Sequence, residues 1–316
     1  MNEGNAAISR SGVIPFPLLG HCVINLAKPK GISSHRAVER VRKISGIKRA
    51  GHAGTLDPMA TGVLLVCTGE ATKVTRFLSD LDKEYLAVMK LGERTDTYDA
   101  EGEVIGRAEG FSVKREDIER VLPEFTGTIE QTPPMYSAIK MGGRPLYKLA
   151  RKGMTVERRK RMVTVHEIRL TGFSLPFVEA KISCSKGTYI RSLCNDIGEA
   201  LGVGAHITAL ERTRIGRFSL RDSITLEGLE ELMAGHGSRG TPAAGVSSID
   251  ESLGHLRELA LGKAESGRAR NGLPLKAAGD LLLPPGYLRL KDHAGRLFAV
   301  GESLNGMIRI ERILHI

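Results

Sequence analysis

The sequence predicts an α+β fold, with a core built on a mixed, mostly antiparallel sheet and a small β-rich C-terminal domain. Strand-like and helical segments follow one another through residues 21–232 without the regular βαβ rhythm of a parallel sheet. A linker rich in glycine, serine and proline at 233–250 separates them from residues 251–316, where short strands are divided by turns. A chain of 316 residues is long enough for both domains.

The first predicted elements follow a flexible tail at residues 1–20. The segment "CVINL" reads as a short strand, and the Pro/Gly turn "KPKG" comes directly after it. A helix is expected next, because Ser33 or Ser34 can cap its start and Gly46 can end it. Its apolar face repeats at helical spacing through Ala37, Val38, Val41 and Ile44.

The remaining core elements alternate between strands and helices. The continuous apolar run "GVLLVCTG" predicts a strand covered on both faces, and "KEYLAVMKLG" predicts a second strand. A helix is expected from Ser112, as its cap, to Phe125. The alternating segment "FVEAKISC" predicts another strand, and the helix after it ends near Gly202. In the C-terminal domain, turns at 292–295 and 305–306 divide three short strands.

The balance of charge favours a polyanionic partner. The formal net charge is +10 and the pI is about 9.5, which is typical of proteins that bind nucleic acid, although a basic surface also serves solubility. No apolar run approaches the roughly 20 residues that cross a bilayer, so no membrane partner is expected. The four cysteines lack CxxC spacing, which argues against a zinc site and favours a reducing cytoplasm.

Basic residues concentrate in one segment, which we call the basic arm, at about residues 131–165. Its only acidic residue is Glu157, so the arm carries a net charge of +8. Such cations neutralise phosphates and release counterions, while Tyr136 and Tyr147 could stack on exposed bases. Its proline and glycine content predicts a flexible insertion, and a basic loop without a set partner is the alternative. The cations are Lys140, Arg144, Lys148, Arg151, Lys152, Arg158, Arg159, Lys160 and Arg161.

A single carboxylate, Asp57, stands in the glycine-rich stretch "GHAGTLDPMATGVLLV". The stretch lacks the GxxxxGK[ST] of a phosphate loop and the GxSxG of a hydrolase. It also holds too few ligands for a metal and one carboxylate where a glycosidase uses two. Asp57 could therefore act as a nucleophile or as a base. As an aspartate before proline, it could equally be a turn residue.

The longer pattern around this stretch resembles the catalytic motif of the TruB family of tRNA pseudouridine synthases. Further segments are similar to that family in the same order, from about residue 21 to the end of the chain. These segments are "KPKGISSH", "GHAGTLDPMATGVLLVCTGEATK", "DKEYLAVMKLGERTDTYDAEG", "PPMYSAIKMGGRPLYKLAR", "CSKGTYIRSLCNDIGEALG" and "GAHITALERTRIGRF". The C-terminal segment looks like a PUA-type RNA-binding domain. The resemblance implies the pseudouridine synthase fold for the core.

The resemblance also implies a reaction. The family converts the uridine at position 55 in the T loop of tRNA to pseudouridine, without a cofactor or metal. The N-glycosidic bond is cut, the uracil turns, and C5 bonds to C1′ of the ribose. Asp57 matches the family's essential aspartate, as nucleophile or as base. One carboxylate suffices because the uracil is both leaving group and returning nucleophile.

Five further residues match family positions that hold the substrate. His52 matches a residue that packs against the T-loop nucleotides and helps to hold the flipped base. Tyr85 matches the tyrosine that stacks on that base, and Tyr189 matches a second active-site tyrosine. Arg191 matches the arginine paired with the aspartate, and a nearby cation keeps a poorly solvated carboxylate ionised. Leu210 matches an apolar wall of the uracil pocket, although plain core packing explains it equally well.

Two other functions remain compatible with the sequence. A binding module that folds or holds tRNA would need only the basic arm and the C-terminal domain. A guide-RNA-dependent relative is a further alternative, but a chain of this length with its own arm favours a stand-alone enzyme. We expect a monomer that binds the T-arm stem-loop without a guide RNA.

Overall fold

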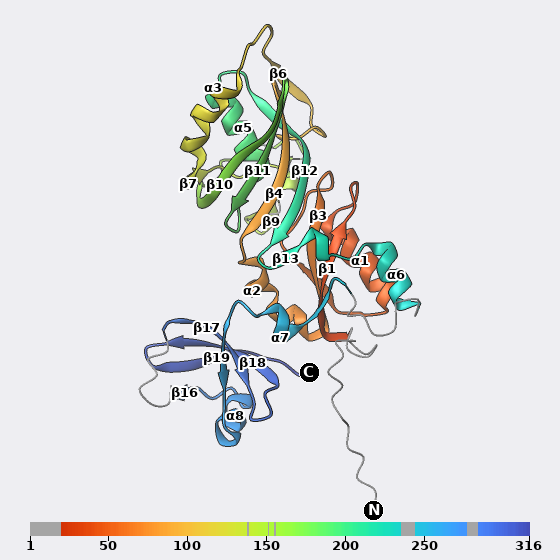
Figure 1. The fold of residues 1–316 in the computed structure, drawn as a ribbon, viewed down its shortest axis with the longest axis vertical. Coiled ribbons are helices and arrows are strands. Elements are labelled where there is room, and N and C mark those ends of the chain that lie inside the picture. The colour runs from red at the N-terminus through yellow and green to blue at the C-terminus, as the bar shows by residue number, and fades with distance from the viewer. Residues whose placement is uncertain (1–19, 138, 151, 155, 235–243, 277–283) are drawn as a thin grey trace, which may run out of the picture.

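The computed structural model describes residues 20–137, 139–150, 152–154, 156–234, 244–276 and 284–316 (Figure 1). Most of the expected tail, residues 1–19, and the middle of the expected linker, residues 235–243, lie outside this part of the chain. Within it, a large mixed sheet with helices on its faces is followed by a smaller β-rich unit, as the sequence predicts.

The described residues form a ten-stranded main sheet in which every pairing except β3 with β12 is antiparallel. Two short strands, β2 (Ala50–Ala53) and β13 (Phe218–Ser219), pair with β3 and β12 beside the main path. The main path runs β14 (Val246–Ser248), β1 (Cys22–Lys28), β3 (Thr61–Thr68), β12 (Ala205–Ile215), β4 (Lys83–Leu91), β11 (Phe177–Cys184), β10 (Arg161–Ser174) and β7 (Gly127–Gln131).

Helices and two small hairpins complete the core. The hairpins are β5 (Glu93–Thr95) with β6 (Val104–Arg107), and β8 (Lys140–Met141) with β9 (Arg144–Pro145). The α-helices are α1 (Ser34–Ser45), α2 (Thr75–Ser79), α3 (Arg115–Val121), α4 (Leu146–Ala150), α5 (Ile190–Ala200), α6 (Leu226–Met233) and α7 (Ile249–Ser252). Short 3₁₀ turns are η2 (Gly69–Val74), η3 (Leu122–Phe125) and η4 (Leu220–Asp222).

The pattern of apolar residues follows from which faces of the sheet are covered. In β3, Leu64 packs with α1 and α6 on one face, while Leu65 packs with α2 and the C-terminal domain on the other. Both faces are covered, so the strand is a continuous apolar run. In β4 the side chains alternate: Ala87 is buried, whereas Leu86 on the open face is 40% exposed. The expected helix α1 is confirmed, with Ser33 capping its start.

Two element boundaries differ from the sequence prediction. The helix expected from Ser112 begins only at Arg115, because Val113 is buried in the core and Lys114 has an extended backbone, with its N–H donating to the Asp117 carboxylate. Its end tightens into the 3₁₀ turn η3, where Pro123 lies. Near the end of the expected linker, residues 246–248 are the strand β14 paired with β1, and residues 249–250 begin α7. An edge strand of three residues is too short to show the alternating pattern by which strands are predicted from sequence.

The C-terminal domain is a five-stranded sheet that packs against the core. Its strands are β15 (Arg257–Ala260), β17 (Gly286–Lys291), β18 (Leu297–Leu304), β19 (Met307–Ile313) and β16 (Leu275–Lys276), and α8 (Lys263–Arg270) flanks them. Rings of Phe77 and Tyr287 meet edge to face at 4.9 Å, and the guanidinium of Arg76 lies over both rings. Arg76 also pairs with Glu311 at 2.9 Å. Apolar and charged contacts therefore tie the two domains together.

Among the described residues, no helix is long and apolar enough to cross a membrane.

Gly62 is expected to be the least replaceable glycine of the glycine-rich stretch at residues 51–66. It has a φ of +101°, and a Cβ at this position would lie 2.2 Å from the backbone oxygen of Arg212 on β12. We expect Gly62→Ala to destabilise the protein by about 3 kcal/mol, from backbone strain and overpacking together. Gly127→Ala is the matched control, because Gly127 has a φ of +90° with open space around it. Equal losses for the two variants in urea unfolding would contradict the close approach.

Candidate active site

The turn between β2 and β3 places Asp57 at the centre of the site. Leu56 is buried on one side of it, and the Ser34 hydroxyl at the start of α1 accepts from the Leu56 N–H at 2.7 Å and donates to its carbonyl at 3.0 Å. The Ala60 N–H donates to the Asp57 carbonyl at 3.1 Å. The backbone of the turn is thus fixed without the Asp57 carboxylate, which is left free to point into the site.

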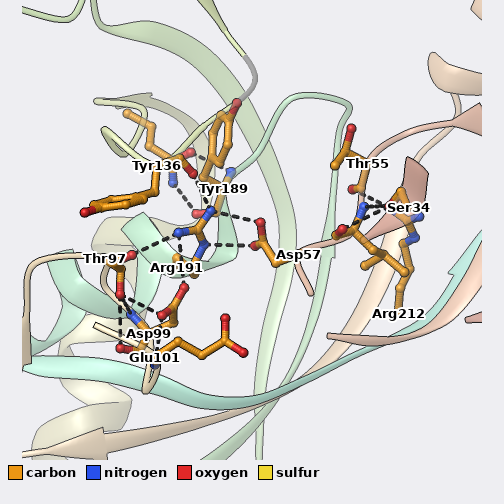
Figure 2. Close-up of polar contacts among 12 residues, drawn as sticks. Ser34, Thr55, Asp57, Thr97, Asp99, Glu101, Tyr136, Tyr189, Arg191 and Arg212 are labelled. Carbon is orange, nitrogen blue, oxygen red and sulfur yellow. Dashed lines mark hydrogen bonds and ion pairs between the residues drawn. The ribbon is translucent and has the colours of Figure 1, made fainter. Parts of the chain in front are cut away.

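Arg191 holds the Asp57 carboxylate in a two-point contact. Its Nε lies 2.9 Å from Oδ2 of Asp57, and its Nη2 donates to Oδ1 at 3.0 Å (Figure 2). The Arg191 side chain is only 4% exposed, while that of Asp57 is 30% exposed and faces the opening. The hydrogen bond from Nη2 sets the direction of the carboxylate, and the close Nε adds attraction between the two charges. The Asp57 carboxylate is therefore paired with a buried arginine and, within the described residues, does not hydrogen-bond to the backbone of its own turn as a turn residue would.

A second carboxylate on the far side of Arg191 completes this network. The Arg191 Nη1 lies 3.2 Å from Oδ2 of Asp99 and donates to the Thr97 carbonyl at 3.0 Å. Its Nη2 also donates to the Tyr136 carbonyl at 2.8 Å. Asp99 is 5% exposed, so the buried cation is shared between two carboxylates and two carbonyls. Such hydrogen bonding is what a buried charge requires.

The electrostatics of Asp57 reflect two opposing influences. Burial raises the pKa of the Asp57 carboxyl above its ordinary value, and the nearby Asp99 adds to that rise. The Arg191 guanidinium opposes both and favours the charged carboxylate. Lys28 lies under the same turn, where its ammonium donates to the carbonyls of Pro29 and Ile32 at 2.8 Å, and burial lowers its pKa to about 8. The acid is thus poised by its surroundings, as in many active sites.

The two tyrosines expected at the site lie close enough to Asp57 for its charge to affect the pKa of their hydroxyls. Tyr189 directly precedes α5; its N–H donates to the Gln131 side chain at 2.8 Å, and its carbonyl accepts from that side chain at 3.0 Å. Tyr85 is a β4 residue that is 7% exposed. Burial raises the pKa of both hydroxyls, and the charge of Asp57 acts in the same direction on each. Both phenols are therefore neutral groups near the acid at physiological pH.

His52 and Leu210 lie on two other strands of the main sheet, β2 and β12. Leu210 is a β12 residue, 6% exposed, and packs in the same apolar cluster as Tyr85. His52 lies on β2, where burial lowers the pKa of its imidazole and the positive charge of Arg212 lowers it further. Its Nδ1 is buried with no hydrogen-bond partner among the described residues. The imidazole is thus kept neutral, and its uncharged flat ring can pack against another planar group.

Sequence reasoning missed Asp99 and Arg212. Asp99 lies within the quoted segment "TDTYDAEG", but nothing in its spacing singles it out from its acidic neighbours. Arg212 is 1% exposed and holds the turn before Asp57 through backbone carbonyls. One signal could have found it: alternation along a strand puts Arg212 on the same face as Leu210.

The basic arm is shorter than its predicted bounds. Residues 127–131 and 161–174 are sheet strands β7 and β10, so the excursion from the sheet covers residues 132–160 and Arg161 belongs to β10. The base of the arm is tied to α5, since the Ser192 hydroxyl donates to the Thr132 carbonyl at 3.0 Å. Residue 151 lies outside the described residues. The exposed cations of the segment are Arg144, Lys148, Lys152, Arg159, Lys160 and Arg161.

Two arm cations are partly engaged within the protein. Arg158 donates to the Pro133 carbonyl at 3.0 Å, and Lys160 pairs with Glu130 at 3.2 Å in an exposed contact. Figure 2 shows Tyr136 of the arm on one side of Asp57 and Ser34 of α1 on the other, so the arm flanks the acid directly. Within the described part of the chain, no group of three or more His, Cys, Asp or Glu side chains converges as a metal site would need.

Comparisons with known proteins agree with this arrangement. Residues 42–190 match the model of the "TruB family pseudouridylate synthase (N terminal domain)", and residues 191–254 match that of the "tRNA pseudouridylate synthase B C-terminal domain". A protein of Pseudomonas paraeruginosa named tRNA pseudouridine synthase B is 45% identical over 295 residues, which span 92% of this chain and 95% of the relative. One of the same name from Clostridium tetani is 51% identical over 209 residues, covering 66% and 72% of the two chains.

Solved structures show the same fold. A chain from the crystal structure of a Cbf5-Nop10-Gar1 complex superposes with a TM-score of 0.75 at 28% identity, covering 95% of this chain and 87% of that one. A chain from an H/ACA RNP bound to a substrate RNA containing 2′-deoxyuridine gives a TM-score of 0.73 at 25% identity, covering 100% and 94%. Because the two family models match consecutive stretches and a relative is 45% identical over nearly its whole length, the chain belongs to the TruB family of pseudouridylate synthases.

Proposed function

We propose that the protein isomerises the uridine at position 55 in the T arm of tRNA to pseudouridine, with Asp57 as the essential acid. The observation that carries the proposal is the carboxylate of Asp57, held at two points by the buried Arg191 and open to solvent on its free side. Membership of the family supplies the reaction class, and relatives named tRNA pseudouridine synthase B support tRNA as the substrate.

The geometry suits a reaction in which one group leaves and returns. The bond between N1 of uracil and C1′ of the ribose breaks, the uracil turns, and C5 bonds to C1′. The C5 proton then goes to solvent, and N1 takes up a proton in its place. No water is consumed, so no second carboxylate is needed to activate one. Asp57 acts as nucleophile or as the base that removes a ribose proton. Its fixed direction and its charge serve either role, and Arg191 keeps it ionised.

The target base must leave the RNA stack to reach this acid. Tyr85 is placed to stack on the flipped uracil, with Leu210 as an apolar wall and Tyr189 as the second tyrosine of the pocket. His52, neutral and flat, packs against the loop nucleotides. The proposal is supported by where these four side chains lie: Tyr85, Leu210 and His52 are on strands of the main sheet, and Tyr189 directly precedes α5.

Binding of the RNA is assigned to the basic arm and the C-terminal domain, residues 251–316, as a PUA-like module. The arm gives the chain its own means of holding a stem-loop, so we propose that it acts without a guide RNA and as a monomer. No cofactor enters the reaction. The four cysteines, Cys22, Cys67, Cys184 and Cys194, are buried and form no disulfide in the part of the chain that the structure describes, which fits a reducing cytoplasm.

The proposal is tested by tritium release from a T-arm stem-loop labelled at C5 of its uridines. Bond formation at C5 expels the hydrogen, so wild-type protein is expected to release the label of one uridine for each RNA. A stem-loop with cytidine at position 55 is the control and should release none. RNA binding without release would instead favour the second candidate, a binding module, which the exposed cations of the arm also support.

Neutralising the arm is expected to weaken binding rather than chemistry. For the variant with Arg158, Arg159, Lys160 and Arg161 all changed to alanine, we expect the affinity for the T arm to fall and its dependence on salt to flatten. The slope of log K against log salt should drop by about 0.9 for each phosphate that the arm no longer neutralises. The control is alanine at Arg115 and Arg120 of the mixed-charge helix α3 and at Lys114, which directly precedes it. An unchanged slope in the arm variant would contradict the assignment.

A further inference from the structure

Arg212 is a fully buried cation for which the described residues supply no acidic partner. Its side chain is 1% exposed, and its contacts are backbone carbonyls: Nε donates to Val63 at 2.7 Å, Nη2 to Gly54 at 3.0 Å and Nη1 to Thr55 at 3.3 Å. Burying a charge is costly unless it is paired or fully hydrogen-bonded. A guanidinium kept in this position must therefore be required for the arrangement of the carbonyls it binds.

Those carbonyls flank Asp57 on both sides of its turn. Gly54 and Thr55 lead into the turn, and Val63 belongs to β3, which follows it. Gly54 has a φ of +91°, and a Cβ there would lie 3.6 Å from Nη1 of Arg212, so the turn closes directly over the guanidinium. In Figure 2, Arg191 and Arg212 lie on opposite sides of Asp57. Arg191 fixes the carboxylate, whereas Arg212 fixes the backbone that carries it.

The same guanidinium also reaches Tyr85. Arg212 and Tyr85 are directly opposite each other on the paired strands β12 and β4, where burial raises the pKa of the Tyr85 hydroxyl and the charge of Arg212 lowers it against that rise. On the other neighbouring strand, Arg212 is aligned with Gly62 of β3. Arg212 therefore lies where the turn of the acid and the strand of the stacking tyrosine meet.

We propose that Arg212 is a positioning residue that holds the Asp57 turn and the Tyr85 ring in one fixed relation. The inference rests on the proposed function, in which Tyr85 stacks on the uracil while Asp57 acts at the sugar of the same nucleotide. Both groups must meet one nucleotide at once, and a displacement of about 1 Å between them can cost about 100-fold in rate. Arg212 itself is too deeply buried to touch the RNA.

The first test is Arg212→Lys, assayed by single-turnover tritium release at saturating T-arm RNA. We expect the rate to fall about 100-fold, because the compact ammonium of lysine cannot reproduce the planar guanidinium that reaches all three carbonyls. The dissociation constant for the RNA should change by less than about threefold, since the basic surface is intact. Arg214→Lys is the matched control: it lies on the same strand, is exposed and pairs with Glu84 at 3.5 Å.

A double-mutant cycle with Tyr85→Phe separates positioning from stability. The phenylalanine keeps the ring and removes the hydroxyl whose pKa the charge of Arg212 lowers. The combined rate loss is expected to be smaller than the product of the two single losses, because each change breaks the same link. Losses that multiply, or a wild-type rate in a folded Arg212 variant, would overturn the inference. Arg212→Gln, which buries no charge, runs the same cycle if the lysine variant does not fold. Absent release by the wild type would overturn the proposed function instead.

Discussion

Asp57→Asn is expected to abolish tritium release from the T arm, with a loss of about 10⁴-fold or more. Asparagine keeps the shape of the side chain but supplies neither a nucleophilic carboxylate nor a base. The two-point contact with Arg191 becomes a contact with a neutral amide, which also leaves the guanidinium facing one buried carboxylate instead of two. RNA affinity should stay within about threefold of the wild type, because the exposed cations of the arm are untouched.

The control for this variant is Asp80→Asn, an identical chemical change at an exposed aspartate that pairs with the exposed Lys186 at 2.8 Å. It should release tritium at the wild-type rate. Circular dichroism and RNA binding establish that the Asp57 variant is folded. Turnover by a folded Asp57→Asn protein would remove Asp57 from the centre of the mechanism, whatever the fate of the family assignment.

Much of the fold could be predicted because local signals and tertiary packing agree. Helix α1 has a serine cap, an apolar stripe and a terminal glycine, and the structure uses all three. The apolar run of β3 predicts a strand buried on both faces, and the strand is buried on both faces in the structure. The expected start at Ser112 was wrong because a capping residue is a local signal, and the burial of Val113 in the core overrides it. Tertiary contacts of this kind leave no periodic trace.

The candidate site divides in the same way. The candidate catalytic stretch could be located from its glycines and its single aspartate, and Asp57 is paired with Arg191, as the resemblance implied. Asp99 and Arg212, which contact Arg191 and the Asp57 turn, could not be located from the sequence. Asp99 comes from a loop more than forty residues along the chain from Asp57, and Arg212 is one of several arginines near the end of β12. Which of those arginines turns inward depends on sheet register, and the register has bulges here.

The network of Asp57, Arg191 and Asp99 predicts that two substitutions shift the pKa of Asp57 in opposite directions. In Arg191→Gln, two buried carboxylates lose their shared cation, so the pKa of Asp57 should rise. Catalysis needs the ionised form, and the ionised fraction grows as pH increases. The acid limb of kcat/KM should therefore move to higher pH, and the rate at pH 7 should fall by about 10² to 10³-fold, with partial recovery toward pH 9.

Asp99→Asn changes the same network in the opposite direction. Asp99 raises the pKa of Asp57 by like-charge repulsion, so removing its charge should lower that pKa and move the acid limb to lower pH. Loss of packing alone would shift both variants the same way, or neither. Profiles of tritium release from pH 5 to 9, with folding checked at each pH, decide between these outcomes. Opposite shifts would establish that the buried cation acts on Asp57 through charge; parallel shifts would show that Arg191 only shapes the pocket.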